Sequence, residues 1–79
     1  MAPAGGEHGA PEGAITCHLD ELLLARGMTL KELSERVGVT VVNLSVLKND
    51  RAKAVRFSTL SALCTALECQ PGDLFRHHA

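Results

Sequence analysis

The segment "MTLKELSERVGVTVVNLSVLKND" (residues 28–50) decides the fold, because it holds two short helical patterns separated by a glycine. In the first pattern, apolar residues recur at the helical period from Leu30 onward. Thr29 and Glu32 form a Thr-x-x-Glu capping box, in which each side chain satisfies a free backbone donor at a helix start. Gly38 suits the left-handed residue that ends a helix. The sequence therefore predicts a helix that begins at Leu30 and stops at Gly38.

A second helix follows after a very short turn. Thr40 is a natural N-cap for "VVNLSVLK" (residues 41–48). Leu44 and Leu47, with Val41 one turn earlier, predict an inward apolar stripe on this helix. Two short helices joined by a turn of about three to four residues make a helix-turn-helix.

The segment upstream predicts an extended stretch and then a helix. "AITCHL" (residues 14–19) alternates apolar side chains, which permits a short strand, and "HLDELLLARG" (residues 18–27) has helical periodicity that ends at Gly27. The extended "AITCHL" and the C-terminal "LFRHH" (residues 74–78) could pair as short strands, within one chain or between two. An otherwise all-α fold with a short terminal strand is therefore expected.

Two further helices are predicted downstream. "NDRAKAVR" (residues 49–56) is a loop, and Ser58 is expected to cap the fourth helix, with Phe57 just outside it. A last short helix starts at "QPGDLF" (residues 70–75), where the proline occupies the first turn.

Composition limits the class of protein. The chain has 79 residues, 46% hydrophobic but only 3% aromatic, so one small core built mainly from Leu, Val and Ala is expected. We expect a disordered tail over residues 1–14, a helix-turn-helix domain over 15–76 and a C-terminal tail over 77–79. The first segment has neither a basic start nor an apolar run, so neither a signal peptide nor a membrane anchor is expected.

The residues above resemble the Cro/C1-type (XRE-like) helix-turn-helix transcriptional regulators. "MTLKELSERVGVT" is similar to that family's second helix and turn, "NLSVLKND" to its recognition helix and exit, and "STLSALCTALECQPGDLF" to its fourth helix and closing turn. The motifs "CHLDELL" and "CQPGDL" are similar to those of a small single-domain bacterial subgroup. The small side chain of Ser34 fits the close crossing of the two helices. The resemblance implies a five-helix, lambda-repressor-like fold, double-stranded DNA as partner, and a homodimer.

The resemblance also implies which residues read bases. The first two residues of the recognition helix and two on its next turn face base edges in this family, and here they are Val41, Val42, Ser45 and Val46. Valine neither donates nor accepts a hydrogen bond, so direct reading is limited to apolar contact with thymine methyl groups, together with what Ser45 and Asn43 offer. Sequence discrimination is therefore expected to be modest or based on DNA shape.

A dense basic segment follows the recognition helix. The net charge of the chain is only -1, yet four of its eight basic residues fall within nine positions, opposed only by Asp50. Such a cluster favours binding to phosphates, with release of their counterions, over residues 48–56. The predicted phosphate contacts are Lys48, Asn49, Arg51, Lys53, Arg56 and the backbone amide of Thr40, at a helix start.

An alternative function uses the same fold. The valines of the third helix exceed what one buried stripe needs, which is also what a helix packed against a second protein would show. The face would then belong to a protein-interaction module.

Other classes of function find little support. The three cysteines lack the spacing of a disulfide framework or a zinc ribbon, so a reduced, cytoplasmic setting without a metal site is expected. No phosphate-binding glycine loop or nucleophile elbow is present. We therefore expect no catalysis, no cofactor, no small-molecule substrate and no membrane partner.

Overall fold

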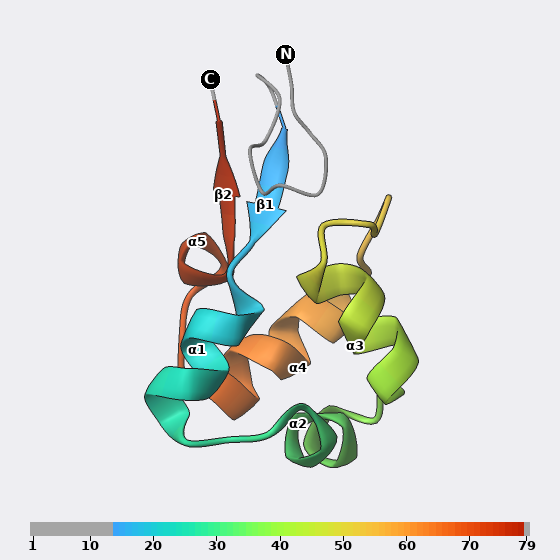
Figure 1. Ribbon diagram of the computed structural model, residues 1–79, viewed down its shortest axis with the longest axis vertical. Coiled ribbons are helices and arrows are strands. Elements are labelled where there is room, and N and C mark those ends of the chain that lie inside the picture. The colour runs from blue at the N-terminus through green and yellow to red at the C-terminus, as the bar shows by residue number, and fades with distance from the viewer. Residues whose placement is uncertain (1–13, 79) are drawn as a thin grey trace.

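The computed structural model describes residues 14–78, and Figure 1 shows their arrangement. Five helices and two short strands follow one another in this part of the chain. They are β1 (Ile15–Cys17), α1 (Leu19–Arg26), α2 (Leu30–Val37), α3 (Val41–Lys48), α4 (Phe57–Leu67), α5 (Pro71–Leu74) and β2 (Phe75–His77). The expected five-helix architecture with a short terminal strand is confirmed.

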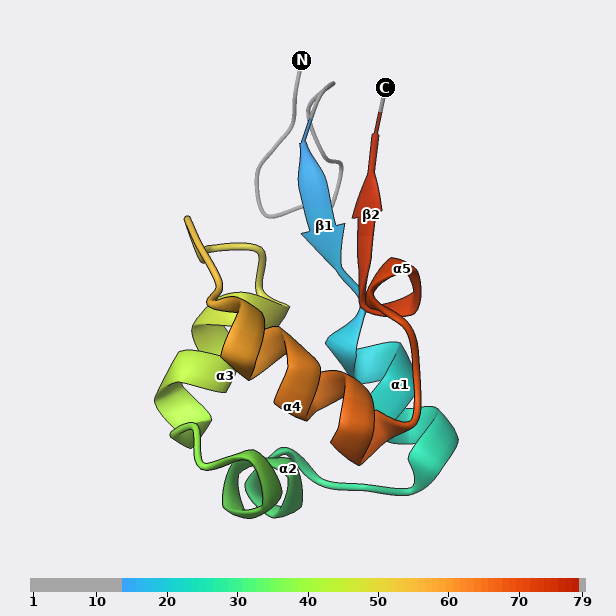
Figure 2. The same cartoon turned by 180° about the vertical axis from the view of Figure 1, so that it is seen from behind.

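The fourth helix organises the bundle. α4 contacts α1, α2 and α5, while α3 packs against α2. Figures 1 and 2 show α4 crossing the middle of the molecule, with α1 and α3 on opposite sides of it. The two strands project from the end of the bundle opposite α2. The helix-turn-helix therefore forms one side of the molecule and the paired strands form another.

The core consists of leucine. All eight buried hydrophobic residues of the described part are leucines, contributed by every helix. Leucine loses little rotamer freedom in a helix, so a leucine core agrees with the helical composition. These residues are Leu19, Leu23, Leu33, Leu44, Leu47, Leu63, Leu67 and Leu74.

Local signals place the starts of α2 and α3 as expected. The amide of Glu32 donates to Thr29 Oγ1 at 3.0 Å, and the amide of Thr29 donates to Glu32 Oε1 at 3.4 Å, which completes the capping box. At α3, Thr40 Oγ1 accepts from the amide of Asn43 at 3.1 Å. These bonds satisfy donors that have no partner within the helix.

The helix ends divide into two kinds. Gly27 and Gly38 close α1 and α2 at φ 62° and φ 73°, as the sequence predicts. Asp50 and Glu68 take the same left-handed conformation after α3 and α4, at φ 61° and φ 53°. Since a Cβ atom disfavours that conformation, left-handed residues at these two positions were not predicted.

Two expectations about helix positions were wrong. α4 begins at Phe57, because the amide of Leu60 already donates to the carbonyl of Arg56 at 2.9 Å, and Ser58 is therefore inside the helix rather than its cap. Val41 does not complete the inward stripe of α3, since 41% of its surface is exposed.

The strands pair within one chain. β1 and β2 are antiparallel, with Thr16 opposite Arg76. The amide of His78 donates to the carbonyl of Ala14 at 2.9 Å, so the pairing extends one residue beyond each strand. The expected domain boundaries at residues 14 and 76 stay predictions. The remainder of the expected N-terminal tail, residues 1–13, lies outside the described residues.

Candidate nucleic-acid interface

The turn between α2 and α3 is fixed by a side chain of α2. Ser34 Oγ donates to the carbonyl of Val39 at 2.6 Å, and this hydrogen bond joins the middle of α2 to the turn. The sequence predicted only that a small residue was needed at Ser34. Its hydroxyl also satisfies a turn carbonyl, so α3 is held at a defined distance from α2.

The outward face of α3 is mostly apolar. Val42 is 70% exposed, and Val41 and Val46 are 41% and 38% exposed. Leu44 and Leu47 on the opposite side are buried in the core. The two faces of one helix thus carry similar residues in different surroundings.

The polar side chains on this face are partly engaged with each other. Asn49 Nδ2 donates to the carbonyl of Ser45 at 2.9 Å and lies 3.3 Å from Ser45 Oγ. Asn43 is exposed and lies three residues after the N-cap Thr40. Fewer polar groups than the sequence suggested are therefore free to contact another molecule.

Three cations of the loop after α3 face solvent. Arg51, Lys53 and Arg56 are exposed, and within residues 14–78 none of them has a carboxylate at ion-pair distance. Lys48 differs, since its Nζ lies 3.2 Å from Asp20 Oδ2 of α1 and its side chain is only 25% exposed. Lys48 therefore ties α3 to α1 in this structure.

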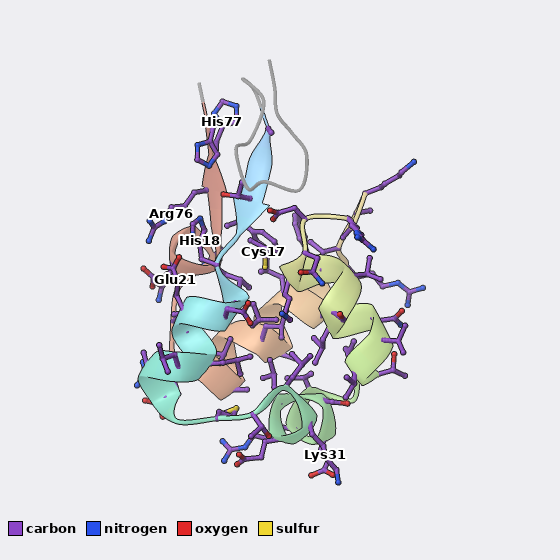
Figure 3. All side chains as sticks on the ribbon, viewed as in Figure 1. Cys17, His18, Glu21, Lys31, Arg76 and His77 are labelled. Atoms are coloured by element: carbon purple, nitrogen blue, oxygen red, sulfur yellow. The ribbon has the colours of Figure 1, made fainter. Side chains whose placement is uncertain are left out.

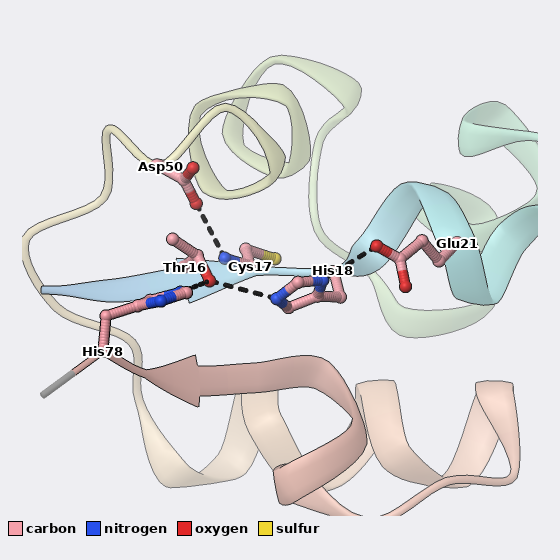
Figure 4. A network of polar contacts seen from close by, with 6 residues as sticks. All are labelled: Thr16, Cys17, His18, Glu21, Asp50 and His78. Carbon is pink, nitrogen blue, oxygen red and sulfur yellow. Dashed lines mark hydrogen bonds and ion pairs between the residues drawn. The ribbon is translucent and has the colours of Figure 1, made fainter. Parts of the chain in front are cut away.

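Asp50 contacts the first strand. Its Oδ1 accepts from the amide of Cys17 at 2.7 Å, on the edge of β1 (Figure 4). Asp50 follows α3 by two residues in the left-handed conformation, and its carboxylate points to the strand (Figure 4). The one acidic residue of the basic segment thus holds the segment against β1, and within residues 14–78 it forms no ion pair with the loop cations.

Two adjoining hollows bring the predicted residues together. An open hollow of about 650 Å³ lies between the turn, α3 and the loop, and a second of about 290 Å³ lies on the outward face of α3. Val46 and Arg51 line both. Of the eleven predicted contact residues, only Lys48 lines neither. The first hollow contains Thr40, Asn43, Val46, Arg51, Lys53 and Arg56, and the second Val41, Val42, Ser45, Val46, Asn49 and Arg51.

The cysteines do not gather into a metal site. All three are free, and no group of three or more metal-binding side chains occurs among the residues that the structure describes. Burial raises the pKa of the Cys17 thiol to about 11, and burial together with the neighbouring Cys64 raises the pKa of Cys69. Figure 3 shows Cys17 on the side of β1 that faces α3. Raised pKa values keep these thiols protonated at neutral pH.

A chain of polar contacts connects the two ends of the domain. Thr16 Oγ1 lies 3.0 Å from His18 Nε2 and 2.9 Å from His78 Nε2, and His18 Nδ1 lies 2.9 Å from Glu21 Oε2 (Figure 4). The hydrogen bond from His18 lowers the pKa of Glu21. His78 is thus exposed but has a partner, which the sequence did not predict.

The sequence model of the Cro/C1-type helix-turn-helix DNA-binding domain matches residues 18–79. The chain therefore belongs to this family. No helix of the described part is long and apolar enough to cross a membrane.

Two known proteins are similar over most of their length. An uncharacterised HTH-type transcriptional regulator, YozG of Bacillus subtilis (strain 168), is 56% identical over 66 residues, which are 84% of this chain and 79% of YozG. The crystal structure of the transcriptional regulator VanUg (form II) superposes with a TM-score of 0.68 at 26% identity, covering 92% of this chain and 96% of VanUg. The family and both relatives support a DNA-binding regulator of transcription.

Proposed function

We propose that this regulator binds double-stranded DNA with α3 in the major groove and with the loop after α3 on the phosphate backbone. The observation that supports the proposal is that ten of the eleven predicted contact residues line two adjoining hollows. A helix with its side chains is about 10–12 Å wide, which fits a major groove about 12 Å wide.

The backbone contacts are assigned to the three unpaired cations. Arg51, Lys53 and Arg56 are exposed beside the hollow and have no ion-pair partner in the part of the chain described. Phosphate binding by such groups releases counterions and makes affinity depend on salt. Lys48 would first have to break its ion pair with Asp20, so we expect it to contribute less to phosphate binding than the three loop cations.

Binding as a homodimer on two-fold symmetric sites is part of the proposal. Dimers of helix-turn-helix proteins place two recognition helices about one helical turn of DNA apart. β1 and β2 pair with each other within one chain, so the proposed dimer does not need these strands to be exchanged between chains.

Charge reversal tests the proposed backbone contacts. Fluorescence anisotropy would compare the unaltered protein with Lys53→Glu and Arg56→Glu, on its own upstream DNA and on a scrambled duplex, at several salt concentrations. Each loss of a phosphate contact lowers the slope of log affinity against log salt by about one unit. Arg76→Glu, on exposed β2, is the matched control for net charge and should leave the slope unchanged. Equal effects of all three changes would reject the assignment to the loop.

The outward valines support one competing function, a protein-interaction module. Val41→Asn combined with Val42→Asn would abolish a protein complex on this face without weakening non-specific DNA binding. Binding to DNA that is lost in the loop variants and kept in the valine variant supports the proposed function. A protein complex that the valine variant loses, in a protein without measurable DNA binding, supports the alternative.

A further inference from the structure

The hollow on the outward face of α3 has an apolar wall and a basic rim. It measures about 290 Å³ and is lined by Val41, Val42, Ser45, Val46, Asn49 and Arg51. Val42 stands furthest out, with 70% of its surface exposed. Three β-branched side chains thus gather on one exposed surface, where an apolar group of a partner could pack against them.

The polar groups of the hollow have limited freedom to read bases. Asn49 Nδ2 is bonded to the carbonyl of Ser45 and approaches its hydroxyl. Bidentate recognition of adenine by an asparagine requires both its amide and its carbonyl group. Since one N–H of Asn49 is bonded to the Ser45 carbonyl and the amide also approaches the Ser45 hydroxyl, its capacity to donate to a base is reduced.

The charges beside the hollow indicate what covers it. Arg51 lies in its lining, and Lys53 and Arg56 are exposed along the adjoining hollow. An apolar surface next to unpaired cations complements a polyanion that presents apolar groups. The major groove of DNA does so through the C5 methyl group of thymine. A 5-methylcytosine base carries the same group at the same ring position.

We propose that this hollow is a binding site for the C5 methyl groups of pyrimidines, and that Val41, Val42 and Val46 make the affinity of the protein depend on them. This inference rests on the proposed placement of α3 in the major groove. Burial of one methyl group gives about a fourfold gain in affinity. Cytosine methylation would then act like thymine at the same position.

Base analogues that differ by one methyl group test this inference. Anisotropy would measure binding to an alternating A·T duplex against an alternating A·U duplex, and to an alternating G·C duplex against its 5-methylcytosine form. We expect tighter binding to the methylated member of each pair, by about fourfold for each methyl group buried. Using two pairs of duplexes controls for differences in DNA stiffness. A direct methyl contact must raise the affinity in both the A·T pair and the G·C pair.

Variants assign the effect to the hollow. Val42→Ser should remove most of the preference for methylated duplexes. Leu24→Ser replaces another exposed apolar side chain, 85% exposed on α1, and should keep the preference.

The outcomes separate this inference from the proposed function. Equal affinity within both duplex pairs, with binding still dependent on salt, would overturn the methyl site and leave DNA binding in place. No binding to any duplex by a folded protein would overturn both. Self-association that Val42→Ser abolishes, together with equal affinity within the pairs, would assign the face to a second copy of the chain and overturn the methyl site.

Discussion

The two faces of α3 carry similar side chains in different surroundings. Leu44 on the inner face is completely buried, whereas Val42 two residues earlier is 70% exposed. Both are aliphatic and both lie in one eight-residue helix. Position relative to α2 and the core, rather than hydrophobicity, decides which side chain stabilises the fold and which is available to a partner.

Truncation on each face should separate stability from binding. Leu44→Ala is expected to lower the free energy of unfolding by about 2–5 kcal/mol, because it removes buried methyl groups and leaves a cavity. Val42→Ala should change it by less than about 0.5 kcal/mol, as is usual for exposed positions. Urea denaturation followed by circular dichroism measures both. A large loss for Val42→Ala would show that its side chain is buried in an assembly.

The angle between α2 and α3, which sets how far the outer face of α3 is presented, depends on the turn before α3. Gly38 has φ 73°, and a Cβ atom added there would meet no heavy atom within 4 Å. Gly38→Ala is therefore expected to destabilise by about 1–2 kcal/mol through backbone strain alone. Thermal unfolding measures the loss. An unchanged melting temperature would mean that the turn adopts another conformation.

Many of the helix boundaries could be predicted because their signals are local. The capping box of Thr29 and Glu32 and the glycines at 27 and 38 each act within a few residues, and the structure confirms them. Val41 was wrongly assigned to the inward stripe because it lies at its edge, about 60° round the helix axis from Leu44.

The contacts that orient the basic loop could not be predicted from local pattern. Asp50 bonds to the amide of Cys17, 33 residues away, and Lys48 pairs with Asp20, 28 residues away. Neither pair has a fixed spacing that sequence reasoning can use. The eleven contact residues were predicted mainly through the family resemblance, and the structure adds which of their polar groups are already engaged.

The left-handed residues after α3 and α4 offer a matched test of the tie between the loop and β1. Glu68→Gly should stabilise by about 0.5–1 kcal/mol, since it removes the strain of a Cβ atom at φ 53° and its exposed ion pair with Arg26 contributes little. Asp50→Gly removes similar strain but also the hydrogen bond to Cys17, so it should give no gain. Urea denaturation compares the two. Equal gains would show that Asp50 does not hold the loop to β1.

The Cys17 thiol reports on the same contact with a smaller effect. Its pKa is raised from 9.0 to about 11, first by burial, while the negative charges of Asp50 and Asp20 also raise it. A raised pKa in the folded state means that the buried thiol contributes to stability below about pH 9, and that this contribution is lost as pH rises toward about 11. In a Cys64→Ser, Cys69→Ser variant, alkylation of Cys17 by iodoacetamide should therefore be slower than that of the unfolded chain at mildly alkaline pH. Adding Asp50→Asn to that variant removes one of the charges and should speed the reaction slightly. Equal rates for the folded and unfolded chain would show that Cys17 is open to solvent, and that the loop is not held over the strand.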